Sequence, residues 1–173
     1  MEFLRVGNKI INEKKIMRVI DKILQMREDG LSQSQVAREI NVDRSFISRL
    51  ESIGEVRKGD KIALVGFPVE NKQELTNLGQ KYGLDYIYLL TEKERWNFIE
   101  ESSGLEIFNQ VIELIVKLKE FDLIIFIGSD MRLDLIEKLM DGEIIGIKIG
   151  ESPINENKYV DTDKIEKIFA ALS

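Results

Sequence analysis

Residues 31–51 read LSQSQVAREINVDRSFISRLE, a polar stretch in which apolar side chains recur at a spacing typical of helices. Ser32 or Ser34 can cap a helix that begins there, because a serine hydroxyl accepts a hydrogen bond from a free backbone N–H of the first turn. The triplet NVD then interrupts the pattern. Its last residue, Asp43, can cap a second helix that ends at Gly54. The sequence therefore predicts two short helices joined by a three-residue turn.

A further helix is expected upstream, over residues 14–30, with Gly30 as its stop. Its apolar residues follow the spacing of one buried stripe, namely Ile16, Val19, Ile20, Ile23 and Leu24. In the pair that follows, Ala37 is small enough for two helices to cross closely, and Asn41 stands where the turn requires a left-handed residue. The shared core is expected to contain Val36, Ile40, Val42, Ile47 and Leu50. The segments VGNKI (6–10) and KGDKI (58–62) are candidate short strands beside this bundle.

The arrangement resembles the helix-turn-helix of Xre/Cro-type and lambda-type repressors. The residues that carry the resemblance are Gln33, Ala37, Asn41 in place of the usual turn glycine, Ile47, Leu50 and the run SRLE at 48–51. It covers about 40 of the 173 residues, from 14 to 54, and implies double-stranded DNA as a partner. Many domains of this family continue with two further helices, whereas here an apolar segment begins at Ile62. The usual dimer surface of the family is therefore in doubt.

The outward positions of the second helix carry groups suited to DNA. Arginine can pair with guanine O6 and N7, and a serine hydroxyl can serve several base edges. The resemblance alone places Gln33 on a phosphate, while Phe46 can touch a thymine methyl or pack on a neighbour. The candidate DNA-binding residues are Gln33, Asp43, Arg44, Ser45, Phe46, Ser48 and Arg49. The alternative is a solvated three-helix bundle that binds protein.

Charge divides the chain into two parts. Residues 1–60 hold 12 Lys and Arg against 10 Asp and Glu, a balance of +2, and residues 61–173 hold 13 against 21, a balance of −8, which sum to −6. A mildly basic part joined to an acidic one suggests two domains with different partners. We expect a helix-turn-helix domain over residues 1–58 and a second domain over residues 61–173.

The composition also narrows the chemistry. The chain has neither cysteine nor histidine, so it lacks a disulfide framework, the usual general base and the commonest metal ligand. No cofactor, metal or catalytic residue is expected. No apolar run approaches the roughly 20 residues that span a bilayer, and the N-terminus lacks the apolar core of a signal peptide. We expect a cytoplasmic protein without membrane contact.

Beyond residue 61, apolar and amphipathic segments alternate. Strands are expected at 62–67, 86–90, 123–127 and 144–149, and helices at 72–82, 92–101, 105–120, 132–140 and 164–172. This alternation favours a parallel sheet covered on both faces. The runs IALV and LIIFI are the most apolar, which predicts central strands, while YIYLL and IIGIKI are expected at the edges. The fold class is therefore α/β: a helix-turn-helix bundle followed by a four-stranded, doubly wound, Rossmann-like sheet of order 2-1-3-4.

In such a sheet, ligands bind where the first and third strands end and their connections diverge. The candidate ligand-binding residues are Gly66, Phe67, Gly128, Ser129, Asp130, Arg132 and Ser152. The glycines permit close backbone approach, and the polar side chains suit a small polar effector. The ordinary alternative is that Ser129 or Asp130 only caps a helix. Two pairs are likewise expected to form caps with a partner at the third position: Asn71 with Glu74, and Thr91 with Glu94. Neither GxGxxG nor GxxxxGK[ST] occurs.

Residues 91–120 are longer than one crossover helix requires. The extra segment, which holds Trp96 and Phe98, is expected to be a second helix covering the core, with a lid or a dimer contact as alternatives. The function expected is a sequence-specific DNA-binding transcriptional regulator whose second domain senses an effector or forms a homodimer, and not an enzyme. The alternative is a small α/β enzyme or partner-binding module with a fused bundle, although no base accompanies Ser129 and Asp130.

Overall fold

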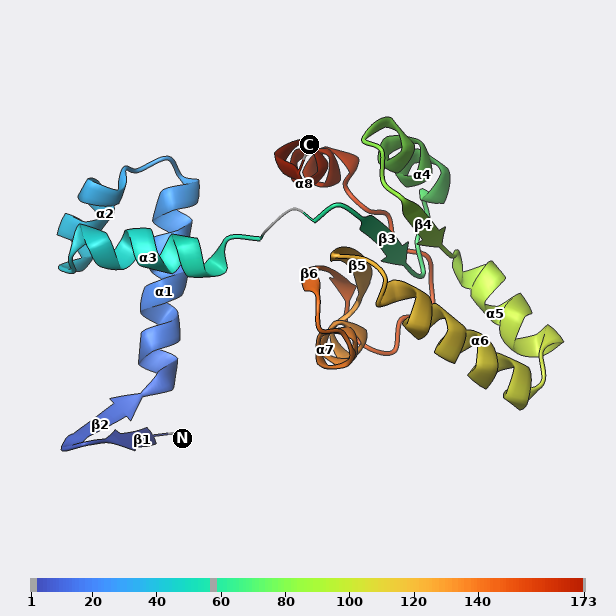
Figure 1. Ribbon diagram of the computed structural model, residues 1–173, viewed down its shortest axis with the longest axis horizontal. Coiled ribbons are helices and arrows are strands. Elements are labelled where there is room, and N and C mark those ends of the chain that lie inside the picture. The colour runs from blue at the N-terminus through green and yellow to red at the C-terminus, as the bar shows by residue number, and fades with distance from the viewer. Residues whose placement is uncertain (1–2, 57–58, 173) are drawn as a thin grey trace. The chain divides into compact units, whose positions relative to one another are not determined.

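The computed structural model describes residues 3–56 and 59–172 of the chain (Figure 1). The chain divides into two compact units, Met1–Glu55 and Val56–Ser173. This division falls slightly before the expected domain boundary. Residues 57–58 lie outside the described residues, and the expected strand over 58–62 is wrong for residues 59–61, because the chain bends there and only Ile62 lies in a strand. Within the described ranges, no helix has the length and apolar character needed to cross a membrane.

The first unit contains a hairpin and three helices. Its elements are β1 (Phe3–Val6), β2 (Lys9–Asn12), α1 (Glu13–Glu28), α2 (Gln33–Ile40) and α3 (Arg44–Gly54). The two strands pair antiparallel, with Val6 opposite Lys9. Gly7 turns the chain with φ of 59°, a conformation that glycine adopts without steric cost. The expectation of a strand over residues 6–10 is therefore wrong, because this segment holds the turn.

Four fully or almost fully buried side chains hold the three helices together: Ile23, Val36, Ala37 and Ile47. Asn41 has φ of 61° and ψ of 53°, so the left-handed turn residue expected from the sequence is confirmed. Ser32, rather than Ser34, caps α2 through a reciprocal pair of hydrogen bonds with Gln35. The expected stripe of α1 is only partly right, because Ile16 and Leu24 are exposed while Ile23 is buried.

The second unit alternates strands and helices around one sheet. Its elements are β3 (Ile62–Gly66), α4 (Lys72–Lys81), β4 (Tyr86–Leu89), α5 (Glu92–Glu101), α6 (Gly104–Leu118), β5 (Leu123–Ser129), α7 (Asp130–Leu139), β6 (Glu143–Gly150) and α8 (Thr162–Leu172). All three strand pairings are parallel, in the order β4-β3-β5-β6. The expected order 2-1-3-4 counted the strands of this sheet alone. The labels in the observed order differ from it because the two hairpin strands, β1 and β2, come first in the chain.

Helices α4 and α8 cover one face of the sheet, and α6 and α7 cover the other (Figure 1). An apolar cluster lies under each pair of helices. One packs α4 and α8 on one face through residues such as Leu75 and Phe169. The other packs α6 and α7 on the opposite face through Leu118 and Ile136. Every residue of β3 and of β5 is buried, which agrees with their apolar composition and places them at the centre. The sheet is thus covered on both sides and open at its β4 and β6 edges.

Two sequence-based expectations fail in this unit. Helix α5 buries no residue, so it does not cover the core, and Trp96 is 47% exposed. Asn71 precedes α4 without a side-chain capping bond. Its amide nitrogen donates to Glu74 Oε2 at 3.2 Å, so the expected pair is in contact although it does not cap the backbone. The same nitrogen donates to the carbonyl of Val160 at 2.9 Å, and the amide oxygen accepts from the Val160 N–H at 3.0 Å. Asn71 therefore links the start of α4 to the segment that leads into α8. Thr91 and Glu94 do form the expected capping box.

Candidate functional site

The first candidate surface lies on α2 and α3. Six of its seven expected residues are exposed, namely Asp43, Arg44, Ser45, Phe46, Ser48 and Arg49. The neighbouring positions Ile47 and Leu50 turn into the core of the unit. Because α3 buries only this narrow stripe, its outer face presents two guanidinium groups and two serine hydroxyls to solvent.

Gln33, the seventh residue, belongs to a chain of polar contacts. Its oxygen accepts from Nε of Arg44 at 3.3 Å, and its nitrogen donates to Glu51 Oε2 at 2.7 Å. Arg27 of α1 holds the other oxygen of the same carboxylate, with Nε to Oε1 at 2.5 Å. These hydrogen bonds from Arg27 and Gln33 keep the pKa of Glu51 below its usual value. The network ties α1, α2 and α3 together and positions Arg44 at the start of α3.

The second candidate surface is the carboxyl edge of the sheet, where the structure brings three expected residues together. The Ser129 hydroxyl donates to the Ser152 hydroxyl at 3.3 Å, and Asp130 Oδ1 accepts from the Ser152 N–H at 2.8 Å. Hydrogen bonds from the backbone of Ser152 and of Met131 hold the pKa of Asp130 below its usual value. The pairing of β5 with β6 shifts register at this point, between Gly128 and Ser129. The expected polar groups are therefore largely engaged with one another.

The two expected glycines do not open space for a ligand. A Cβ at Gly66 would lie 2.8 Å from the Cβ of Ile127, and one at Gly128 would lie 2.8 Å from the ring of Phe126. Such distances are shorter than real Cβ contacts, so these glycines allow the sheet itself to pack closely. This packing accounts for glycine at both positions, and the ligand contact expected of them stays a prediction.

Arg132 occupies a different environment from its polar neighbours. Its guanidinium carbon lies 4.8 Å from the ring centroid of Phe67, a cation–π arrangement. Nη1 of Arg132 is buried and has no hydrogen-bond partner within residues 3–56 and 59–172. Burial lowers the pKa of Arg132, the charge of Arg95 lowers it further, and the carboxylate of Glu92 opposes both effects. Arg132 is therefore partly desolvated, with the charges of Arg95 and Glu92 acting on it in opposite directions.

Glu92 and Arg95 of α5 were missed by the sequence analysis. They form an ion pair at 2.6 Å with side chains only 12% and 13% exposed. Arg95 also donates to the carbonyl of Ile154 at 3.2 Å, and Trp96 donates to Glu92 at 2.8 Å. Among the residues that the structure describes, Glu92 Oε2 and Arg95 Nε are buried without a partner. Helix α5 therefore brings charged groups to the sheet edge instead of apolar ones to the core.

An apolar groove runs beside Arg132, between α6 and α7. Its cavity volume is about 190 Å³. Nine of the ten residues that line it are apolar, including Phe67, Leu114, Phe126 and Leu135, and Arg132 is the tenth. A cationic group at the wall of an apolar groove is a combination that the sequence did not predict, because its residues come from four separate segments.

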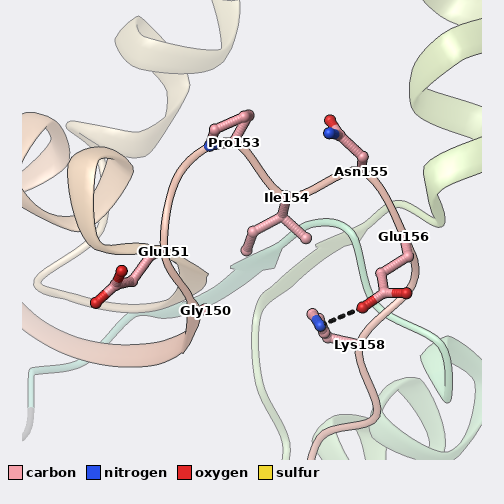
Figure 2. Close-up of a pocket in the computed structure, with 7 residues that line it drawn as sticks. All are labelled: Gly150, Glu151, Pro153, Ile154, Asn155, Glu156 and Lys158. Atoms are coloured by element: carbon pink, nitrogen blue, oxygen red, sulfur yellow. Dashed lines mark hydrogen bonds and ion pairs between the residues drawn. The ribbon is translucent and has the colours of Figure 1, made fainter.

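A second hollow lies in the loop that follows β6 (Figure 2). It has a cavity volume of about 320 Å³. Its charged side chains are engaged with one another or with nearby residues, since Lys158 pairs with Glu156 at 2.5 Å and Glu151 lies 3.7 Å from Lys148. Figure 2 shows the Lys158 and Glu156 side chains facing each other across the loop. The hollow has no unsatisfied charge to attract a ligand, so the groove at Arg132 is the better candidate.

Comparison of the chain with models of protein families, with curated proteins and with solved structures finds no match.

Proposed function

We propose that the chain is a sequence-specific DNA-binding transcriptional regulator that acts in the cytoplasm, with a helix-turn-helix in its first unit. The observation that carries the proposal is the geometry of α2 and α3: a capped helix, a left-handed turn at Asn41, and a following helix whose outer face is exposed. A helix of this kind fits the major groove of double-stranded DNA. The proposal assigns α3 to the groove.

The proposed roles follow from the chemistry of each side chain. Arg44 and Arg49 can each present two parallel N–H groups to the O6 and N7 of guanine. Ser45 and Ser48 can donate to or accept from base edges or phosphates. Gln33, which already contacts Arg44 at 3.3 Å, holds that guanidinium in one orientation and lowers the entropy lost when it binds. Gln33 thus supports base reading by Arg44 as well as any phosphate contact.

Replacing Arg44 with alanine is expected to weaken binding to a preferred DNA site by about 1–3 kcal/mol, because one bidentate base contact is lost. Binding to random DNA should change much less, so the ratio between the two affinities should fall. Titration of both duplexes by fluorescence anisotropy measures this ratio. Lys138→Ala, which removes the same charge from the second unit, is the matched control and should leave both affinities unchanged. If Arg44→Ala weakens binding to the preferred and the random duplex equally, Arg44 does not contact bases.

The second unit is proposed to pair two chains, since a dimer lets two α3 helices read two half-sites. The supporting observation is a stripe of large apolar side chains on α6 that remain exposed: Leu105, Phe108, Ile112 and Val116. Their spacing places them on one side of the helix, roughly a third of a turn away from the side that lines the apolar groove. The partner of this stripe is the same stripe on a second copy of the chain.

Replacing Phe108, which is 63% exposed, with glutamate is expected to raise the dimer dissociation constant by about 30-fold or more, because a buried aromatic anchor is lost and a charge is desolvated. Sedimentation velocity over a range of concentrations measures this effect. Ile10→Glu is the control, since Ile10 is an exposed apolar residue of the hairpin. If Ile10→Glu alone dissociates the dimer, the contact belongs to the hairpin. A wild-type chain that stays monomeric contradicts the dimer altogether.

A further inference from the structure

We propose that the groove between α6 and α7 binds a small hydrophobic carboxylate, whose anionic end pairs with Arg132 and whose hydrocarbon part fills the apolar groove. The inference rests on the proposed regulatory function only in treating this ligand as an effector. The binding site itself stands on the contacts around Arg132.

The charge balance at the groove calls for an anion. Arg95 and Arg132 carry two positive charges, and Glu92 supplies one negative charge that Arg95 already holds at 2.6 Å. Arg132 lines the groove and is partly buried, and a charge taken out of water is costly unless it is paired. Nη1 of Arg132 lacks an acceptor among the described parts of the chain, so a carboxylate oxygen would satisfy it.

The remainder of the groove selects for hydrocarbon. Phe67, Leu114, Phe126 and Leu135 offer no hydrogen bonds from their side chains, and a polar ligand body would lose its hydration there without compensation. The volume of about 190 Å³ is slightly larger than an apolar cavity of about 150 Å³ that holds benzene. One aromatic ring or one short branched chain therefore fits, and a nucleotide does not.

This ligand differs from the small polar effector expected from the sequence. Ser129 and Ser152 bond to each other, and Asp130 is held by backbone N–H groups. Their hydrogen-bonding capacity is mostly used within the protein, and the Asp130 carboxylate would repel an anion. Of the residues expected to contact a ligand, Arg132 and Phe67 are the two that line the groove.

The test is calorimetric titration of the full chain with benzoate, 3-methylbutanoate and hexanoate, and with benzamide and inorganic phosphate as controls. At least one of the three acids should bind with a dissociation constant below about 1 mM. Benzamide, which has the same shape as benzoate but no charge, should bind about 10- to 100-fold more weakly than benzoate, because the charge-assisted bond is absent. This comparison needs no variant and so does not depend on how a variant folds.

Variants then locate the site. Arg132→Gln should weaken binding of the acid by about 10- to 100-fold. Leu135→Ala, at a residue that lines the groove and is 54% exposed, should weaken it several-fold. Lys138→Gln, which removes a charge from the exposed side of the same helix, should leave the affinity unchanged.

Four results would overturn the inference. Two concern the ligand: none of the three acids binds with a dissociation constant below about 1 mM, or benzamide or phosphate binds as tightly as benzoate. Two concern the site: the Arg132→Gln variant binds the acid with unchanged affinity, or a second copy of the chain displaces the acid as the protein concentration rises. The effect of the acid on DNA binding is measured separately. If the acid binds without changing the affinity of the chain for DNA, the binding site is supported but the acid is not an effector. If the chain binds DNA but none of the acids, the proposed function is supported and the proposed ligand site is wrong.

Discussion

Replacing Ile47 with alanine is expected to unfold the first unit and abolish DNA binding. Ile47 is fully buried at the centre of the cluster that joins α1, α2 and α3. Truncating a buried isoleucine to alanine costs about 2–5 kcal/mol, and a unit of this size has little stability to spare. Far-ultraviolet circular dichroism should show the loss of helix, and DNA titration should show no binding.

The second unit gives an internal reference for this experiment. The single tryptophan and all four tyrosines of the chain lie beyond residue 55, so near-ultraviolet circular dichroism reports mainly on the second unit and should stay unchanged. The neighbouring substitution Phe46→Ala, at an exposed residue, should preserve the helix signal. An Ile47→Ala chain with wild-type helix content and DNA affinity would contradict the assignment of this core.

Replacing Asn71 with alanine is expected to destabilise the second unit by roughly 2–6 kcal/mol, because the N–H and C=O of Val160 each lose a buried partner at about 1–3 kcal/mol per group. Asn71 is 8% exposed and joins segments 89 residues apart in the sequence. Urea unfolding, followed by near-ultraviolet circular dichroism, should show a lower midpoint with an unchanged slope.

Asn77→Ala is the matched control for this measurement. Asn77 lies on the exposed side of α4, where its side chain contacts only Gln73 among its described hydrogen-bond partners, at 3.0 Å. Exposed substitutions of this kind usually change stability by less than about 0.5 kcal/mol. If Asn71→Ala and Asn77→Ala unfold at the same urea concentration as the wild-type chain, the clamp on Val160 contributes nothing measurable.

The sequence predicted the features that depend on local chemistry. Asn41 was recognised because few other residues adopt a left-handed turn, and Thr91 because a hydroxyl followed by glutamate at the third position forms a capping box. The continuous apolar runs at β3 and β5 predicted central strands, since only strands buried on both faces lack alternation. The hairpin turn at Gly7 and Asn8 was not predicted, although Gly-Asn between two short strands is typical of a two-residue turn.

The features that were missed depend on contacts between distant segments. Asn71 resembled a helix cap, but its partner Val160 lies on another segment. Trp96 resembled a core residue, yet it serves the ion pair of Glu92 and Arg95 on the surface of α5. Asp130 looked available for a ligand until the fold placed the backbone N–H of Ser152 against it. No local pattern in the sequence carries this information.

Selection of binding sites from a pool of random duplex DNA, with the full chain at physiological salt, tests the central claim most directly. A dimeric helix-turn-helix regulator should enrich a sequence with two related half-sites about one helical turn apart, because its two α3 helices would read adjacent major grooves. Arg44→Ala should lose the preference at one position in each half-site. A pool that shows no enriched sequence, while the chain remains folded by circular dichroism, would contradict the account.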